Sequence, residues 1–88
     1  MRLRLTEARV EADLHLGRHR DLIAELRALT AEHQLRERFR AQFMLACYRS
    51  GRQAEALEAY REARATLIGE LGAEPTPELR LVQPQVTP

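Results

Sequence analysis

The sequence contains no lysine, no asparagine and no tryptophan, so its fourteen strongly basic side chains are all arginines. Thirteen carboxylates nearly balance them and leave a net charge of +1. The two signs alternate along the chain, whereas a domain that coats nucleic acid concentrates unpaired positive charge on one face. Direct DNA binding by this chain alone is therefore not expected. Without lysine and asparagine, the clamp that some repeat proteins use for a partner's terminal carboxylate is not expected either.

Cysteine and long apolar runs are also scarce. The single cysteine, Cys47, has no partner for a disulfide within the chain, which favours a reducing compartment. No apolar run is long enough to span a bilayer, and the first residues lack the pattern of a secretory signal. We therefore expect a cytoplasmic protein that does not associate with membranes.

The length and composition fit one small folded domain. The chain has 88 residues, of which 44% are hydrophobic and 31% charged, as in ordinary globular proteins. All four prolines lie after residue 74. We expect a helical-repeat domain over residues 1–82 and a flexible, proline-rich tail over residues 83–88.

Apolar residues recur at helical spacing, and no segment alternates apolar and polar residues over the length of a strand. The pattern predicts helices over residues 3–16, 21–33, 36–50 and 53–71, and a glycine follows the first, third and fourth of them as a stop. The helix over 36–50 is apolar on nearly every side and should be central. Thr76, Pro77 and Glu78 form a helix-start pattern that predicts a short fifth helix over residues 77–82.

Two glycine turns, or elbows, each join two neighbouring helices, so the four helices form two similar pairs. Gly17 and Gly51 stand thirty-four residues apart, each between two predicted helices. This is the period of tetratricopeptide repeats. The predicted fold is all-α, a tetratricopeptide-like right-handed array of antiparallel helix pairs, with about four helices plus a short C-terminal helix.

One histidine pair has the spacing of a metal site. His15 and His19 would point at a common ion if they lay on one continuous helix. Gly17 falls between them and is the predicted turn, so we expect polar side chains at an elbow and no metal.

Catalysis finds no support in the pattern of nucleophiles. Cys47 shares a helix face with Phe39 and Phe43, where a thiol packs as a small hydrophobe, and Ser50 lies at an elbow. All three histidines belong to the first repeat. We therefore predict that the chain is not an enzyme and needs no cofactor.

Three arginines stand close together in the stretch "RERFR", at positions 36, 38 and 40, and Glu37 interrupts them. The sequence leaves three interpretations open: contact with DNA, pairing with carboxylates of a partner or of the chain itself, or a solvated face.

The first helix of each pair lines the concave groove in tetratricopeptide-like arrays. In the second pair this face presents the candidate partner-binding residues Arg38, Ala41, Leu45, Tyr48 and Arg49. A leucine and a tyrosine framed by arginines suit a protein interface. The alternative is that neighbouring helices cover this face.

Three blocks give the chain a more specific resemblance: "EADLHLGRH", "LRERFRAQFMLACYRSGRQAEALEAYR" and "ELGAEPTPELR". From about Leu3 to Leu81 the sequence resembles the bacterial transcriptional activator domain of the SARP-type antibiotic regulators of actinobacteria. Gln34 stands where that family's pattern has proline, which removes a rigid joint between the repeats.

The resemblance implies transcription regulation through protein contacts, with RNA polymerase or a second regulator subunit as the partner. It also implies that the winged-helix DNA-binding domain and the leading helices of such regulators are not part of this chain. Their absence should leave an apolar edge that favours a homodimer. The alternative is a general tetratricopeptide-like adaptor that binds a peptide and is unrelated to transcription.

Overall fold

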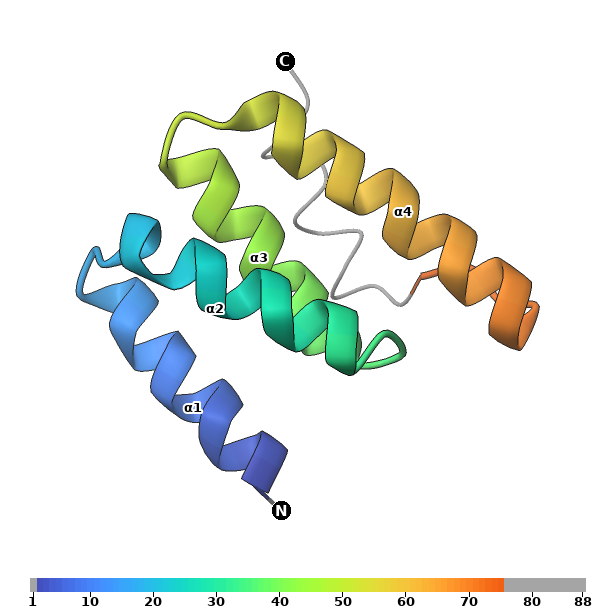
Figure 1. Ribbon diagram of the computed structural model, residues 1–88, viewed down its shortest axis with the longest axis horizontal. Coiled ribbons are helices and arrows are strands. Elements are labelled where there is room, and N and C mark those ends of the chain that lie inside the picture. Colours follow the sequence, from blue (N-terminus) through green and yellow to red (C-terminus); the bar gives the residue numbers. More distant parts are fainter. Residues whose placement is uncertain (1, 76–88) are drawn as a thin grey trace.

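The computed structural model describes residues 2–75, which form four helices and no strand. The helices are α1 (Arg2–His15), α2 (His19–Glu32), α3 (Glu37–Arg49) and α4 (Gln53–Leu71), as Figure 1 shows. Their bounds lie within two residues of the predicted ones. The expected fifth helix over 77–82 and the tail over 83–88 lie outside the described residues.

Both elbows are built on a glycine in the left-handed conformation, with φ of 80° at Gly17 and at Gly51. The residue after each glycine donates its N–H to the carbonyl four positions before that glycine, over 3.1 Å in the first elbow and 2.8 Å in the second. This hydrogen bond defines a Schellman cap, and the left-handed conformation costs glycine little. The thirty-four-residue repeat is therefore confirmed at the level of backbone hydrogen bonds.

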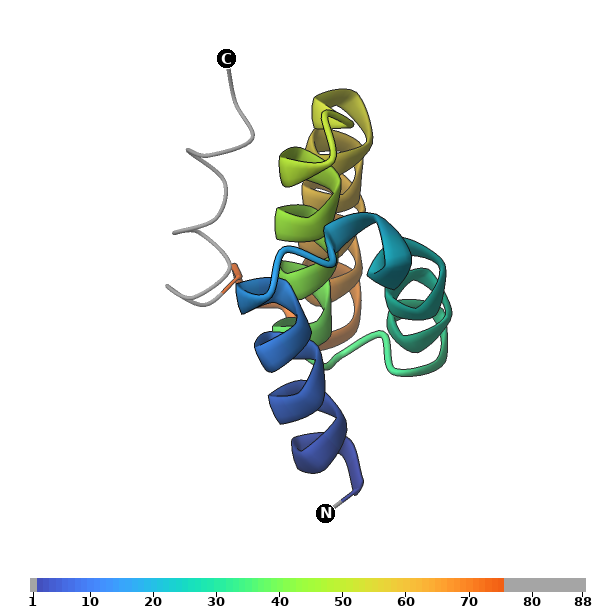
Figure 2. The same ribbon diagram turned by 90° about the vertical axis from the view of Figure 1, so that its left-hand side faces the viewer.

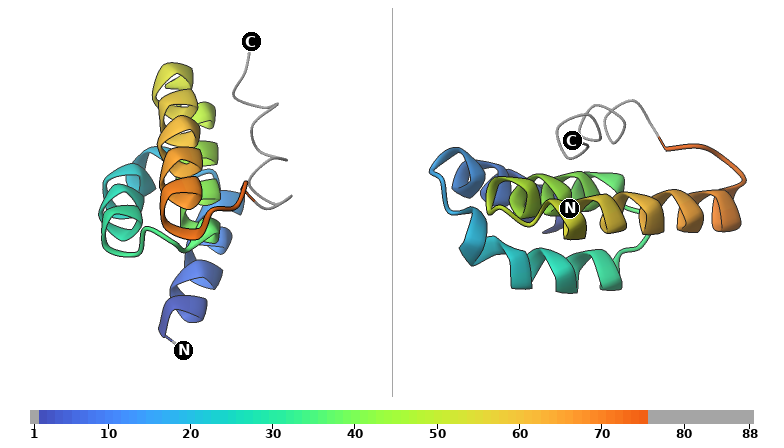
Figure 3. Two further views of the ribbon diagram at one scale, coloured as in Figure 1. Left: turned by 90° about the vertical axis from the view of Figure 1, so that its right-hand side faces the viewer. Right: turned by 90° about the horizontal axis from the view of Figure 1, so that it is seen from above.

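The third helix is the centre of the fold, as predicted. α3 packs against α1, α2 and α4, whereas α2 and α4 pack on it without packing on each other. In Figure 1, α2 crosses the face of α3, and in the side view of Figure 2 it lies to one side of the other helices. The view from above in Figure 3 shows α2 as a layer of its own below α3 and α4.

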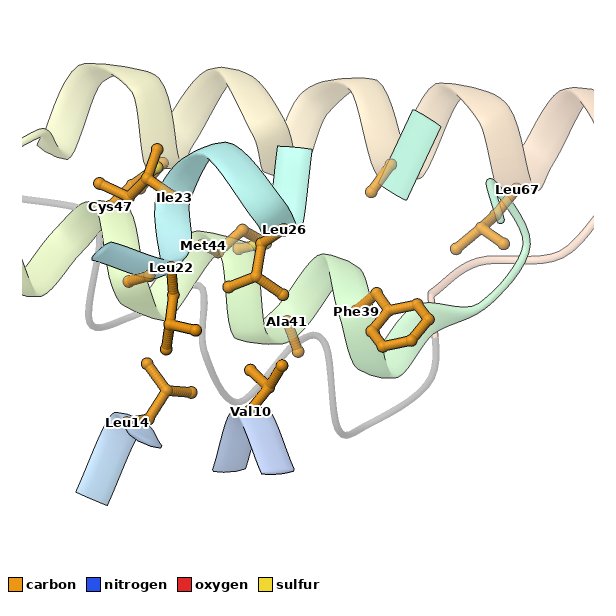
Figure 4. Packing of buried hydrophobic residues seen from close by; sticks show 13 residues of the cluster. Val10, Leu14, Leu22, Ile23, Leu26, Phe39, Ala41, Met44, Cys47 and Leu67 are labelled. Atoms are coloured by element: carbon orange, nitrogen blue, oxygen red, sulfur yellow. The ribbon is translucent and has the colours of Figure 1, made fainter. Parts of the chain in front are cut away.

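The core joins all four helices. Val10 of α1 points toward Ala41 of α3, and Leu14 points toward Leu22 of α2 (Figure 4). The buried hydrophobic residues are Val10, Leu14, Leu22, Ile23, Leu26, Phe39, Ala41, Met44, Ala46, Cys47, Ala56, Ala63 and Leu67. Burial of these side chains is the main source of stability, because each removes apolar surface from water.

The helices of residues 2–75 lack the combination of length and apolar character needed to cross a bilayer.

Candidate partner-binding surface

The five candidate partner-binding residues differ in exposure. Arg38 and Arg49, near the two ends of α3, are exposed, and Leu45 and Tyr48 are half-buried against the core. Ala41 is buried, with 6% of its surface exposed, because it faces α1. A neighbouring helix therefore covers one of the five, and partner binding by the other four stays a prediction.

Two of the three arginines around the start of α3 pair with carboxylates of α1. Nε of Arg36 lies 2.5 Å from Oε2 of Glu7, and a guanidinium nitrogen of Arg38 lies 3.9 Å from Oε1 of Glu11. The guanidinium of Arg36 also lies over the ring of Phe39, at 5.8 Å. These contacts support pairing within the chain over the other two interpretations.

Arg40 differs from its two neighbours because it is buried, with 8% of its surface exposed. Its Nε donates a hydrogen bond of 2.7 Å to the backbone carbonyl of Gln34, and burial lowers the pKa of its guanidinium. Neither a solvated face nor a DNA patch describes this side chain, and those interpretations are wrong for Arg40. The hydrogen bond holds the α2–α3 joint at the position where the family's pattern has proline.

Gln42 is a second buried polar residue of α3, and it was not among the residues predicted to be functional. Its Nε2 donates to the backbone carbonyl of Glu7 over 3.0 Å and to the carboxylate of Glu11 over 3.3 Å. A glutamine within the apolar run "FRAQFMLACY" was the available signal, since a buried amide needs partners from another element. Gln42 thus fixes α3 against α1.

A groove of about 470 Å³ opens over α3 where α2 and α4 fail to meet. At one end the guanidinium of Arg27 bridges the two helices by a 2.8 Å contact with Glu55, and it lies 5.6 Å from the ring of Phe43. The lining is Arg27, Thr30, Ala31, Gln34, Arg40, Phe43, Glu55, Glu58, Ala59, Glu62 and Thr66. Both arginines and glutamates line this groove, so its surface suits charged peptide segments of either sign. The lining side chains form no catalytic arrangement.

The residues considered for chemistry are held in structural roles. His15 ends α1 and His19 begins α2, so the turn at Gly17 separates them as predicted. Nδ1 of His15 lies 2.8 Å from the carbonyl of Glu11. Within residues 2–75, no three histidine, cysteine or acidic side chains are grouped as metal ligands.

Cys47 is completely buried, and burial raises the pKa of its thiol. A nucleophilic cysteine needs the opposite, a lowered pKa and access to solvent. The thiol therefore belongs to the core.

This geometry defines the class of protein. It is a tetratricopeptide-like array of two helix pairs, and the two helices of each pair are joined by an equivalent glycine turn. The chain belongs to the bacterial transcriptional activator domain family, whose model matches residues 1–87. The resemblance to SARP-type regulators is thereby confirmed.

Several relatives are transcriptional or regulatory proteins. The chain is 53% identical to the regulatory protein AfsR of Streptomyces griseus over 85 residues, and 54% identical to the regulatory protein DnrI of Streptomyces peucetius over 82 residues. It is 44% identical to the transcriptional regulatory protein EmbR of Mycobacterium tuberculosis over 79 residues. These matches cover 97%, 93% and 90% of this chain.

The chain spans 9% of the length of AfsR, 30% of DnrI and 20% of EmbR. A solved structure of Mycobacterium tuberculosis EmbR in complex with a low-affinity phosphopeptide matches the fold with a TM-score of 0.89 and 43% identity. That match covers 92% of this chain and 21% of the EmbR chain. The similarity thus extends over nearly all of this chain and over a minor part of each relative.

Proposed function

We propose that this chain is a helical regulatory module that contributes to transcription regulation in the cytoplasm through protein–protein contacts. The observation that carries the proposal is its identity of 44% to 54% with three regulatory proteins over at least nine-tenths of its length. No catalytic step is part of this function.

We assign the contact to the exposed part of α3, with RNA polymerase as the partner. Arg38 has 47% of its side chain exposed, and Leu45 and Tyr48 present half-buried apolar surface beside it on the same helix. Half-buried apolar and aromatic groups next to an arginine are the usual composition of a protein interface.

A second copy of the chain is the alternative partner, because α1 and the turn that follows it carry an apolar edge. Leu5 is 74% exposed and Leu16 is 66% exposed. Burying both in a homodimer would remove this surface from water, as the terminal pairs of helical arrays require.

The test fuses the chain to an unrelated DNA-binding domain and measures transcription from a promoter that carries the matching operator. We expect activation by the wild-type fusion and its loss in Arg38→Glu, since charge reversal opposes a complementary partner. The matched control is Arg61→Glu on α4, because Arg61 is 67% exposed and paired only at 4.0 Å with Glu58.

Capture of purified RNA polymerase by the isolated chain identifies the partner. Capture that weakens in Arg38→Glu and persists in Arg61→Glu supports the proposal. Equal loss in both variants would reject the α3 surface. A fusion that binds its operator without raising transcription would favour a general peptide-binding adaptor.

A further inference from the structure

The groove over α3 contains a smaller pocket of about 30 Å³. Three helices contribute its lining, which is Thr30 of α2, Arg40 and Phe43 of α3, and Ala59 and Glu62 of α4. The pocket has room for about two waters or for a flat polar group of that size. Neither the groove nor the pocket includes a residue of the α3 surface that we assign to the RNA polymerase contact.

Arg40 brings a buried positive charge to the pocket. It is 8% exposed, and within residues 2–75 its one hydrogen bond runs from Nε to the backbone carbonyl of Gln34. The terminal nitrogens Nη1 and Nη2 have no partner in this part of the chain, and they are not among its unpaired polar atoms that are closed to solvent. Buried charges are normally paired in proteins, so these nitrogens indicate room for an acceptor from outside.

Glu62 borders the pocket from α4 and supplies an acceptor. Its carboxylate forms no ion pair or hydrogen bond within residues 2–75, although its charge raises the pKa of Arg40 against the larger, lowering effect of burial. Thr30 supplies a second acceptor, because its hydroxyl proton already points to the carbonyls of Leu26 and Arg27 at 2.9 Å and its lone pairs remain. The pocket therefore has donors from α3 and acceptors from α2 and α4 that do not reach each other.

We propose that the pocket binds the side-chain carboxamide of a glutamine or asparagine in a segment of a partner protein. The carboxamide oxygen accepts hydrogen bonds from the terminal nitrogens of Arg40, and the NH₂ group donates to Glu62 and Thr30. Phe43 and Ala59 supply apolar contact for the methylene groups that carry the amide. A neutral group thus satisfies the cation and the carboxylate at once.

The two opposite charges exclude other side chains. A partner's carboxylate would pair with Arg40 and lie against Glu62, whereas an ammonium group would pair with Glu62 and lie against Arg40. An apolar side chain would cover both charges without giving either a partner. A backbone amide has a donor and an acceptor too, but a trans peptide points them in opposite directions. The carboxamide carries both at one end of a side chain.

A protein segment is the ligand that fits the rest of the groove. The lining extends along α4 from Glu55 to Thr66, about 16 Å at the helical rise, which exceeds the length of a free amino acid. Roughly five residues of extended chain span that distance. Glu58 and Thr66 lie along this path and offer polar contacts to the residues on either side of the amide. The inference rests on the proposed protein-binding function and adds a second contact surface to it.

The experiment titrates the 88-residue chain, labelled with ¹⁵N, with short blocked alanine peptides that carry a central glutamine, glutamate or lysine. We expect saturable amide shifts for the glutamine peptide at residues that line the groove. Its dissociation constant should be at least about tenfold lower than that of the glutamate or lysine peptide, because each of these meets a like charge. Equal binding of the three peptides would overturn the proposal.

Glu62→Gln tests the exclusion of acids by a gain of binding. Glu62 is exposed, so the variant should keep the fold. Loss of the negative charge should tighten binding of the glutamate peptide at least about tenfold, which an unfolded chain could not produce. The matched control is Glu58→Gln, which removes the same charge from the groove but outside the pocket, and it should retain the preference for glutamine. Equal gains in the two variants would reject the pocket.

Peptide binding and polymerase capture can be told apart. Binding of the glutamine peptide by a chain that captures no polymerase would support the pocket and reject the polymerase as the partner. Polymerase capture by a chain that does not distinguish the three peptides would reject the pocket alone. Free glutamine that binds as tightly as the glutamine peptide would overturn the assignment to a partner protein, since the groove beyond the pocket would then contribute nothing.

Discussion

Nε of Arg36 lies 2.5 Å from Oε2 of Glu7, twenty-nine residues away in the sequence, and joins the start of α3 to α1. The Glu7 side chain is 14% exposed and that of Arg36 is 32% exposed. Nε2 of Gln42 in α3 donates to the Glu7 backbone carbonyl, so Arg36 and Gln42 both hold Glu7 of α1 in place. α1 is thereby placed by polar contacts as well as by its apolar stripe.

Replacing Glu7 by Gln should lower the free energy of unfolding by about 1 kcal/mol, because a partly buried, charge-assisted hydrogen bond loses its charge. Urea denaturation followed by circular dichroism measures the change. Glu58→Gln is the control, since Glu58 and Arg61 are exposed and 4.0 Å apart, and it should change stability by less than about 0.5 kcal/mol. Equal losses of stability in the two variants would show that the contact between Glu7 and Arg36 contributes no more than an exposed ion pair.

The two elbow glycines should respond alike to substitution. Gly17→Ala and Gly51→Ala should each cost about 1 kcal/mol, because both positions have φ of 80°, which alanine adopts poorly. Neither position has an atom within 4 Å of an added Cβ, so the cost comes from the backbone alone.

Gly69 provides the matched control for this pair. It lies within α4, and an added Cβ there also meets nothing within 4 Å. Gly69→Ala should therefore stabilise the chain, by up to about 1 kcal/mol, through helix propensity. Thermal denaturation of the three variants checks the opposite signs, and a destabilised Gly69→Ala would contradict the explanation.

Local features of the fold could be predicted from the sequence, whereas contacts between helices could not. The helix bounds and the Gly17 and Gly51 elbows follow from short-range periodicity and turn chemistry. Arg40 was grouped with its neighbours because the sequence shows only that arginines recur. Its burial depends on the Gln34 carbonyl, which the α2–α3 joint brings to it.

The same limit applies to the candidate partner surface. Helical spacing places Ala41, Leu45 and Tyr48 on one face, but it cannot tell which neighbour covers that face. Val10 of α1 lies opposite Ala41, so part of the face is core. Arg20 and Arg49 come from different repeats, and only the packed structure places both in the lining of one hollow at the first elbow.

Cys47 should react slowly with a thiol reagent. Its side chain is completely buried, and burial raises the pKa of the thiol, so both access and the thiolate fraction are low. Labelling with a chromogenic disulfide should be on the order of a hundredfold or more slower in the native chain than in urea, because reaction requires opening of the core. Native and unfolded rates of similar size would place Cys47 outside a stable core.

His19 should titrate below the ordinary histidine value. Burial lowers the pKa of its imidazole, and the positive charge of Arg49 lowers it further. Proton NMR of the imidazole signals across a pH series measures this pKa directly. Arg49→Ala should raise the pKa of His19 by removing the nearby charge, whereas Arg61→Ala should leave it unchanged. An unchanged value in Arg49→Ala would show that the two groups do not interact.

The lowered pKa also sets the direction of a stability change with pH. Because the unfolded imidazole binds a proton more readily than the folded one, its contribution to stability is lost as the pH falls through about 6.5, the ordinary histidine value. The loss continues until the pH drops below the folded pKa of His19. Replacing His19 by Gln should therefore reduce the stability difference between about pH 7.5 and about pH 5. Urea denaturation at both values measures it, and the same difference in wild type and His19→Gln would exclude His19 as the cause.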